Sequence, residues 1–262
     1  MKWLITLYLY KNGPISAQVL FSVAGLATQI LVLDSKKDDE SIPVGLMIDL
    51  GDGACRDLLS QKIDFSWINH IAITHGHYDH MGGLYTFLGI KRMLGHTGQI
   101  HIYFPQGCEE VLTVINTIQE RYKGAENTYS IIPHVINQNE PDIQFKIGSS
   151  FELKPYFVDH KGSTVKDGIL ITDKSIPAVG YKIICLTNDK SISYSGDTGP
   201  VSTLYDLFSC DVGFIEATHP NDSWVSDKIN RYHLTEDEAI SFSKNCRRPI
   251  IIHKLPRHIN KK

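Results

Sequence analysis

The chain has 262 residues, of which 42% are hydrophobic and 21% are charged, values that are ordinary for a globular protein. The formal net charge of −3 provides no overall attraction to nucleic acid, so a nucleic-acid substrate would require a local basic patch. No internal repeat or low-complexity segment is visible. These features favour an ordinary globular protein, here a single domain spanning residues 1–262.

Five cysteines, at positions 55, 108, 185, 210 and 246, are odd in number, and no two are close in the sequence. We therefore expect free thiols in a reducing compartment, the cytoplasm, and no disulfide framework. The apolar stretch 15–33 is interrupted by polar residues and glycine, which favours two strands joined by a bend over the alternative of a membrane helix. We expect no association with a membrane.

The first half of the chain alternates predicted strands with predicted helices. An Asn-Gly turn at 12–13 favours a β-hairpin of residues 3–10 and 15–23. Residues 36–40 are expected to form a charged turn. Further strands are expected at 26–33, 44–50, 68–73, 99–104 and 130–136, and helices at 54–61 and 107–122.

The second half is β-rich at first and then mixed. A strand at 150–159 should deliver His160 at its end, and Thr235 with Glu238 forms a capping box that begins a helix. The remaining predicted elements are a hairpin of 179–186 and 191–195, strands at 212–216 and 249–253, and helices at 201–208 and 235–246. This order predicts two packed sheets with helices on their outer faces.

A dense group of metal-binding residue types follows the predicted strand 68–73. Six positions contain His75, His77, Asp79 and His80. Imidazole nitrogen and carboxylate oxygen are the atoms that zinc and similar cations prefer. The alternation allows the first two histidines to face one metal while the other two residues face a second. The alternative is a histidine-rich surface loop without a metal.

Together with later residues in the same order, this motif resembles the metallo-β-lactamase fold superfamily and, within it, ribonuclease Z and its phosphodiesterase relatives. The later residues are His160, Asp197, Glu216, His233 and His253. The resemblance extends from about residue 45 to Arg257 but is sharp only at these motifs. It implies an α/β (α+β) fold, a four-layer αββα sandwich.

The resemblance also implies two metal ions per chain, Zn²⁺ with Mn²⁺ or Fe as alternatives. The expected ligands are His75, His77 and His160 for the first metal, Asp79, His80 and His253 for the second, and Asp197 as a bridge. Glu216 would orient His233, which would protonate the leaving oxygen, and Asp79 would orient or deprotonate the attacking water. Asp49 and Gly51 form an Asp-x-Gly element that would either support a ligand imidazole or be a plain turn.

Two departures from ribonuclease Z concern RNA binding. Residues 21–28 lack the basic Pro-x-Lys-x-Arg-Asn loop of that family, and we expect the 36 residues between His160 and Asp197 to be too few for a strand pair plus its RNA-gripping arm. We therefore expect a metal-dependent phosphodiesterase with a small-molecule or RNA substrate. The alternatives are ribonuclease Z proper, a hydrolase of a lactam, thioester or sulfate ester, and, more remotely, a binding module. Whether the chain forms a homodimer stays open.

Overall fold

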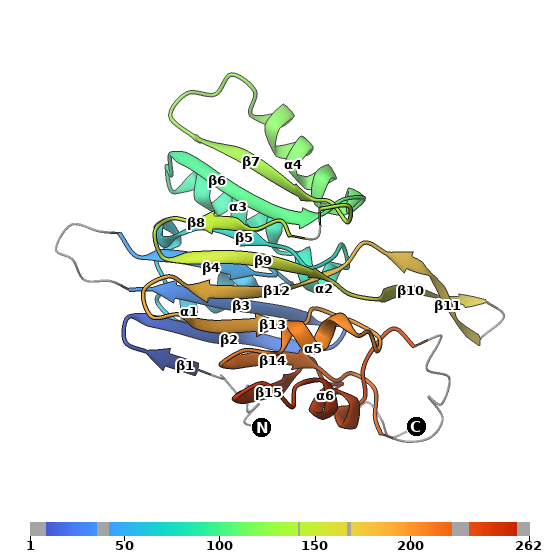
Figure 1. Cartoon of the computed structure of the whole chain (residues 1–262). Coiled ribbons are helices and arrows are strands. Elements are labelled where there is room, and N and C mark those ends of the chain that lie inside the picture. The colour runs from blue at the N-terminus through green and yellow to red at the C-terminus, as the bar shows by residue number, and fades with distance from the viewer. Residues whose placement is uncertain (1–8, 36–41, 141, 167–168, 222–230, 256–262) are drawn as a thin grey trace. The chain divides into compact units, whose positions relative to one another are not determined.

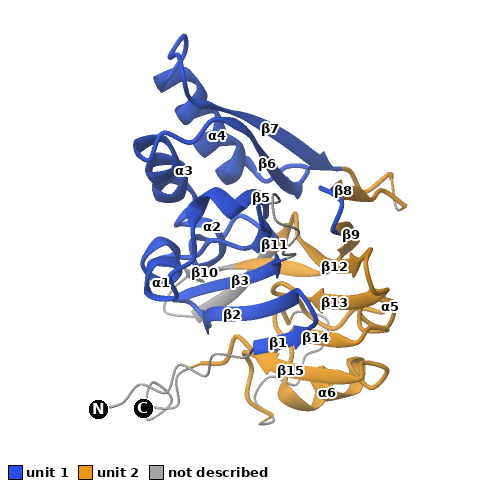
Figure 2. Ribbon diagram, turned by 90° about the vertical axis from the view of Figure 1, so that its left-hand side faces the viewer, with its two compact units in different colours: residues 1–136, 147–150 blue, residues 137–146, 151–262 orange. Residues whose placement is uncertain are grey.

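The computed structural model describes residues 9–35, 42–140, 142–166, 169–221 and 231–255 (Figure 1). The chain divides into two compact units, residues 1–136 with 147–150 and residues 137–146 with 151–262 (Figure 2). Each unit is described by itself below, and the single domain expected from the sequence stays a prediction. The charged turn expected at 36–40, the first part of the expected strand 3–10, and Arg257 lie outside the described residues.

The first unit contains a seven-stranded sheet in the order β1-β2-β3-β4-β5-β6-β7. Its strands are β1 (Leu9–Asn12), β2 (Ile15–Val23), β3 (Ala27–Asp34), β4 (Val44–Ile48), β5 (Ile68–Ala72), β6 (Gly98–Pro105) and β7 (Tyr129–Ile136). The predicted hairpin is confirmed as β1 and β2, and the stretch 15–33 forms two strands, as expected. Pro133 is tolerated because β7 ends the strand order and is an edge strand.

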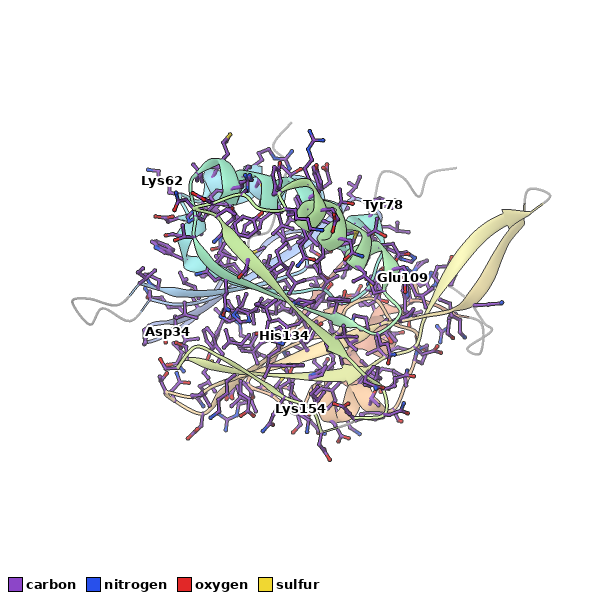
Figure 3. All side chains as sticks on the ribbon, turned by 90° about the horizontal axis from the view of Figure 1, so that it is seen from above. Asp34, Lys62, Tyr78, Glu109, His134 and Lys154 are labelled. Atoms are coloured by element: carbon purple, nitrogen blue, oxygen red, sulfur yellow. The ribbon has the colours of Figure 1, made fainter. Side chains whose placement is uncertain are left out.

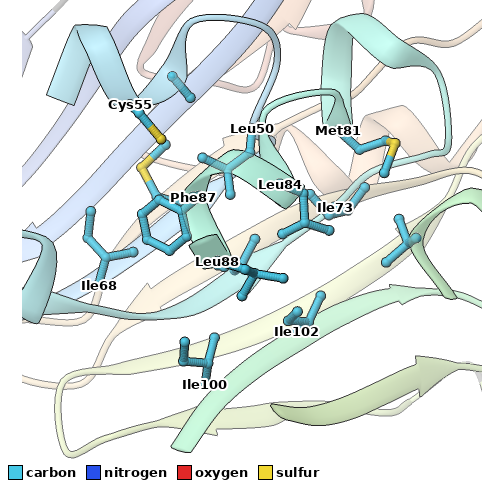
Figure 4. Packing of buried hydrophobic residues seen from close by; sticks show 14 of the residues in the cluster. Leu50, Cys55, Ile68, Ile73, Met81, Leu84, Phe87, Leu88, Ile100 and Ile102 are labelled. Atoms are coloured by element: carbon cyan, nitrogen blue, oxygen red, sulfur yellow. The ribbon is translucent and has the colours of Figure 1, made fainter. Parts of the chain in front are cut away.

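Helices of the first unit lie along one face of this sheet (Figure 2). They are α1 (Ala54–Ser60), α2 (Tyr78–Met81), α3 (Leu84–Met93) and α4 (Glu109–Arg121), with a 3-10 turn at Phe65–Trp67. Side chains from α1 and α3 pack with strand residues in one hydrophobic core, where Leu84, Phe87 and Leu88 are fully buried (Figure 4). Truncating such a buried side chain to alanine costs about 2–5 kcal/mol, so this core anchors the helices to the sheet.

One lysine of α3 is also buried. Lys91 is 0% exposed, and its Nζ donates to the carbonyl oxygens of Phe65 and Ile68 at 2.9 and 2.8 Å and to Oδ1 of Asn69 at 2.7 Å. Burial lowers the Lys91 pKa to about 8. These three hydrogen bonds join α3 to the chain that enters β5.

The second half of the first sheet positions the metal-binding motif. Strands β4 to β7 are parallel to one another, so their carboxyl ends lie along one edge. Asp49 directly follows β4, and His75 comes three residues after β5 ends. Adjacent parallel strands therefore place the Asp-x-Gly element beside the histidine motif.

The second unit contains a six-stranded sheet in the order β15-β14-β13-β12-β9-β8 and a separate two-stranded sheet of β10 and β11. The strands are β8 (Phe145–Ile147), β9 (Phe151–Phe157), β10 (His160–Lys166), β11 (Ile169–Ile176), β12 (Val179–Cys185), β13 (Lys190–Tyr194), β14 (Val212–Glu216) and β15 (Arg248–Ile252). Strands β13, β14 and β15 run parallel. Helices α5 (Thr203–Leu207) and α6 (Glu236–Phe242) cover a second core that includes Phe208, Ile215 and Leu234.

The capping box at the start of α6 is confirmed, since the Thr235 hydroxyl accepts from the Glu238 N–H and the Glu238 carboxylate accepts from the Thr235 N–H. The helix ends at Phe242, before the predicted residue 246. The hydroxyl of Ser243, at the C-cap, donates to the Ala239 carbonyl and so competes for a helical acceptor.

The structure corrects one expectation about the interval from His160 to Asp197. His160 begins β10 and does not end β9, because β9 ends at Phe157 and residues 158–159 belong to no strand. The interval holds a second hairpin, β10–β11, besides the predicted β12–β13 hairpin, and the expectation that it is too short for an RNA-gripping arm stays a prediction. The sequence carried a signal for the β10–β11 hairpin: Asp167-Gly168, a preferred hairpin dipeptide, stands between two runs that contain β-branched residues.

Candidate metal centre

The first unit gathers the four residues of the histidine motif on one short loop and the helix that follows it. His75, Asp79 and His80 are buried and His77 is half-buried. The ring centre of His75 lies 4.7 Å from that of His77 and 4.2 Å from that of His80. Three imidazoles and a carboxylate therefore share one small volume within this unit.

Asp49 fixes the orientation of two of these rings. Its fully buried carboxylate accepts from Nδ1 of His80 at 2.7 Å and from the Thr74 N–H at 2.8 Å. The Thr74 hydroxyl donates to the same carboxylate and lies 3.0 Å from Nδ1 of His75, so it accepts from that ring. In both neutral rings the proton then sits on Nδ1 and the lone pair on Nε2, the form that binds a metal. The supporting role predicted for the Asp-x-Gly element is the one observed, and its partner Thr74 was not foreseen.

The Asp-x-Gly loop also packs tightly on α2. The Leu50 N–H donates to the His80 carbonyl at 2.7 Å, and the Gly83 N–H donates to the Leu50 carbonyl at 2.7 Å. A Cβ at Gly51 would lie 2.3 Å from the Asp79 carbonyl oxygen, so only glycine fits there. These contacts fix the backbone of the histidine motif against the Asp-x-Gly loop.

The turn between β2 and β3 holds the motif from another side. The Gly25 N–H donates to Oδ2 of Asp79 at 3.0 Å, and the Tyr78 hydroxyl donates to the Gly25 carbonyl at 3.0 Å. Tyr78 is 66% exposed and is labelled in Figure 3. In this turn a main-chain N–H therefore positions a carboxylate of the motif.

The second unit carries the remaining predicted residues at the ends of three strands, at the start of β10 and, for His233, in the segment before α6. His160 Nδ1 donates to the Tyr232 carbonyl at 2.9 Å, and Asp197 follows β13. His253 follows β15 with a left-handed φ of 52°, a backbone conformation that is uncommon outside glycine and often marks a functional residue. Its Nδ1 lies 3.3 Å from Oδ1 of Asp197 and 3.0 Å from the Thr218 hydroxyl.

The Thr218 hydroxyl gives its own hydrogen to the His253 carbonyl at 2.9 Å, so it accepts from the His253 ring. His253 and His160 therefore present Nε2, as His75 and His80 do in the first unit. The acceptor of His160 is the Tyr232 carbonyl oxygen and that of His253 is the Thr218 hydroxyl. Both lie far from their histidine in the sequence, and no sequence motif indicated them.

Glu216 and His233 form the carboxylate–imidazole pair expected from the resemblance. Glu216 is the last residue of β14 and is fully buried, and its Oε1 lies 2.9 Å from Nδ1 of His233. The carboxylate also accepts from the main-chain N–H groups of Thr198, Thr218 and Leu234. Glu216, His233 and His253 each bring one ligand atom within 4.8 Å of the others. The half-buried His233 ring therefore bonds to a carboxylate whose orientation is fixed by three main-chain donors.

Several histidines without a predicted role are packing residues. His219 is buried beside Tyr232, and burial, followed by the charge on His233, lowers the pKa of His219 to about 4. In the first unit His70 stacks on His101 with ring centres 4.8 Å apart. Burial lowers the pKa of His70 to about 4, with a further contribution from His101 and His134.

The description "Beta-lactamase superfamily domain" fits residues 52–259, so the chain belongs to the beta-lactamase superfamily. Ribonuclease Z of Porphyromonas gingivalis is 24% identical over 235 residues, which cover 76% of this chain and 75% of that protein. Ribonuclease Z of Bacteroides fragilis is 45% identical over 67 residues, but they cover only 26% of this chain and 22% of that protein. The crystal structure of the short form of human tRNase Z superposes with a TM-score of 0.69 at 20% identity and covers 93% of both chains.

These likenesses confirm the predicted metallo-β-lactamase fold and its closeness to ribonuclease Z. Each unit contributes one large sheet and helices, and the second unit adds the two-stranded sheet of β10 and β11. The fold is one of metal-dependent hydrolases, and the chain is an enzyme of this class. Within the described ranges, no helix is both long and apolar enough to cross a membrane.

Proposed function

We propose that the chain is a phosphodiesterase that uses two zinc ions, with manganese or iron as alternative metals. The observation that carries this proposal is that five of the six histidines proposed as ligands or proton donor share one ring orientation. Nδ1 faces an oxygen acceptor in His75, His80, His160, His233 and His253, so that Nε2 is the basic nitrogen in each. Histidines that only pack are under no constraint to share one tautomer, whereas metal ligands and proton carriers are.

The residues fit the proposed metals in number and chemistry. The proposed ligands are His75, His77, Asp79 and His80 from the first unit and His160, Asp197 and His253 from the second. Imidazole and carboxylate donors suit zinc, and three or four ligands per ion leave a position for solvent. When bound, the two ions would activate water as a nucleophile and neutralise charge on the phosphoryl oxygens.

The chain's own residues supply orientation and the proton. The Gly25 N–H fixes the orientation of the Asp79 carboxylate, which would orient or deprotonate the attacking water. Glu216 holds Nδ1 of His233 and stabilises the imidazolium form, so that Nε2 can give a proton to the departing oxygen. The cluster of main-chain donors around Glu216 keeps that carboxylate in one position.

We propose a phosphodiester as the substrate, either a small molecule or RNA. A second candidate is precursor-tRNA cleavage, as the name ribonuclease Z says of the relatives. The β10–β11 hairpin favours it, because the interval between His160 and Asp197 contains a strand pair beyond the predicted one. The net charge of −3 and the absence of the basic loop at residues 21–28 favour a small substrate.

The main test is hydrolysis of bis(p-nitrophenyl) phosphate by the purified chain with and without a chelator. Asp79→Ala and Asp197→Ala should each abolish turnover, whereas Asp52→Ala, an exposed carboxylate in the first unit, should leave it unchanged. Near-full activity of either of the first two variants would refute the assignment. Nitrocefin and a thioester serve as alternative substrates, and preference for either would favour another hydrolase of the fold.

A second test isolates the proton donor through the leaving group. p-Nitrophenolate leaves without a proton, but the alkoxide of a dinucleoside phosphate requires one. His233→Ala should therefore lower turnover of the dinucleoside phosphate by about 10²–10⁴-fold, the range of general-acid catalysis, and affect the nitrophenyl ester far less. Equal losses on both substrates would argue that His233 holds a metal or the fold.

Two further parts of the proposal concern the state of the protein. Metal analysis of the purified chain should find two zinc ions per chain, and light scattering distinguishes a monomer from a homodimer. We also propose a cytoplasmic location, because an odd number of cysteines without close pairs in the sequence is typical of proteins of reducing compartments.

A further inference from the structure

Two cysteines that are far apart in the sequence meet in the second unit. Val212 of β14 pairs with Arg248 of β15 in a parallel register, and Cys210 and Cys246 each lie two residues before that pair. The Arg247 N–H donates to the Cys210 carbonyl at 3.0 Å and extends the register beyond the strands. The two sulfur atoms are 3.5 Å apart. Two cysteines that are 36 positions apart in the sequence are therefore neighbours in the fold.

The two thiols are chemically different. Cys210 Sγ is placed to donate its one hydrogen to Cys246 Sγ or to the Val212 carbonyl oxygen, which is 3.3 Å away. The hydrogen bond from Cys210 lowers the pKa of the Cys246 thiol and burial opposes it. The N–H groups of Arg248 and Gly213 lower this pKa further, and the negative charge of Asp211 raises it. The same hydrogen bond, together with burial, raises the pKa of Cys210. By contrast, burial raises the pKa of Cys55, in the first unit, to about 11.

Both cysteines are buried, so little of either residue is accessible to solvent. Cys210 is 7% exposed and Cys246 is 8% exposed. A small oxidant is therefore a better match than a protein or a bulky disulfide. The thiolate is the reactive form of cysteine, so Cys246 is the thiol that would react first.

We propose that Cys210 and Cys246 form a redox-modification site that a small peroxide converts into a disulfide. The Cys246 thiolate attacks one peroxide oxygen, the O–O bond breaks, and Cys246 becomes a sulfenic acid while an alcohol, or water from hydrogen peroxide, leaves. The Cys210 sulfur then attacks the sulfenic sulfur and expels water. In total two thiols lose two electrons and two protons, and the peroxide is reduced by the same two electrons.

The bond would staple the amino ends of β14 and β15. The carboxyl ends of these two strands carry Glu216 and His253, so the modification acts on the pair of strands that positions both residues. A disulfide between these cysteines would join residues 36 positions apart and restrict the unfolded chain. We therefore expect the thermal midpoint of unfolding to rise by about 5–10 °C on oxidation.

The test uses the full chain treated with hydrogen peroxide after removal of reductant. Trypsin releases Cys246 on the tripeptide 245–247 and Cys210 on the peptide 191–228. We expect these two peptides to be joined, two of the five thiols to be lost, and dithiothreitol to restore both. Five thiols that stay reduced, or sulfinic acid without the joined peptides, would overturn the proposal.

Variants separate the two roles. In Cys210→Ser the sulfenic acid of Cys246 cannot be resolved, so dimedone added while the oxidised protein is unfolded should label position 246. In Cys246→Ser the thiol of Cys210 should stay unlabelled, and labelling there instead would reverse the assigned order. Cys55→Ser is the matched control, since it removes another buried thiol and should leave the crosslink intact. Because the peptide analysis of the unaltered chain stands alone, poor folding of a variant leaves the test decisive.

Discussion

Replacing Asp49 with asparagine tests the support beneath the metal-binding motif. The carboxylate accepts from the His80 ring directly and from the His75 ring through Thr74. An amide has one acceptor oxygen in place of two, so at least one of these donors loses its partner. Removing an outer acceptor of this kind typically lowers metal affinity or activity about 10–100-fold. A lost hydrogen bond to a charged group also costs about 1.5–3 kcal/mol of stability.

The assay is zinc affinity by chelator competition, together with kcat/KM on bis(p-nitrophenyl) phosphate. Asp52→Asn is the matched control, because this exposed carboxylate lies three residues away in the same loop and should have no effect. If Asp49→Asn folds and keeps both zinc affinity and kcat/KM within about twofold of the parent, the motif does not depend on this acceptor and our account of the tautomers is wrong.

Three further predictions concern packing and pH. Gly51→Ala places a Cβ 2.3 Å from the Asp79 carbonyl oxygen and should lower zinc affinity and the urea midpoint, whereas Gly89→Ala, with nothing within 4 Å, should be neutral or stabilising. Lys91→Met leaves three acceptors without their donor and should cost about 3–4 kcal/mol in urea unfolding; a loss below about 1 kcal/mol would contradict this. The pKa of His70 falls from 6.5 in the unfolded chain to about 4 in the fold, so stability should drop as pH falls through that window. His70→Gln should flatten this drop, by about 2 kcal/mol after allowance for solvent screening, and an unchanged pH profile would contradict it.

How far the sequence predicts this protein depends on how local each feature is. The strand before His75 and the capping box at Thr235 are set by neighbouring residues, and both are where they were expected. The Gly25 N–H that holds Asp79 depends on contacts across 54 positions, and the Tyr232 carbonyl that holds His160 on contacts across 72. A main-chain donor or acceptor has no residue type of its own, so such partners leave no pattern to read.

Other differences have a different physical cause. The β10–β11 hairpin was missed although its Asp-Gly dipeptide is a recognised turn signal, because the interval was judged by length alone. The contact between Cys210 and Cys246 follows from the register of two parallel strands, which the sequence does not specify.

Asp49 also has a consequence for how the centre would fill. Its carboxylate orients His75, which we assign to one ion, and His80, which we assign to the other. Binding of the first ion would fix the position of this shared carboxylate. Binding of the second ion would then cost less conformational entropy, because part of its site is already ordered. Zinc uptake should then be cooperative, with the doubly loaded protein accumulating at the expense of the singly loaded form, and native mass spectrometry during a zinc titration would display that distribution directly.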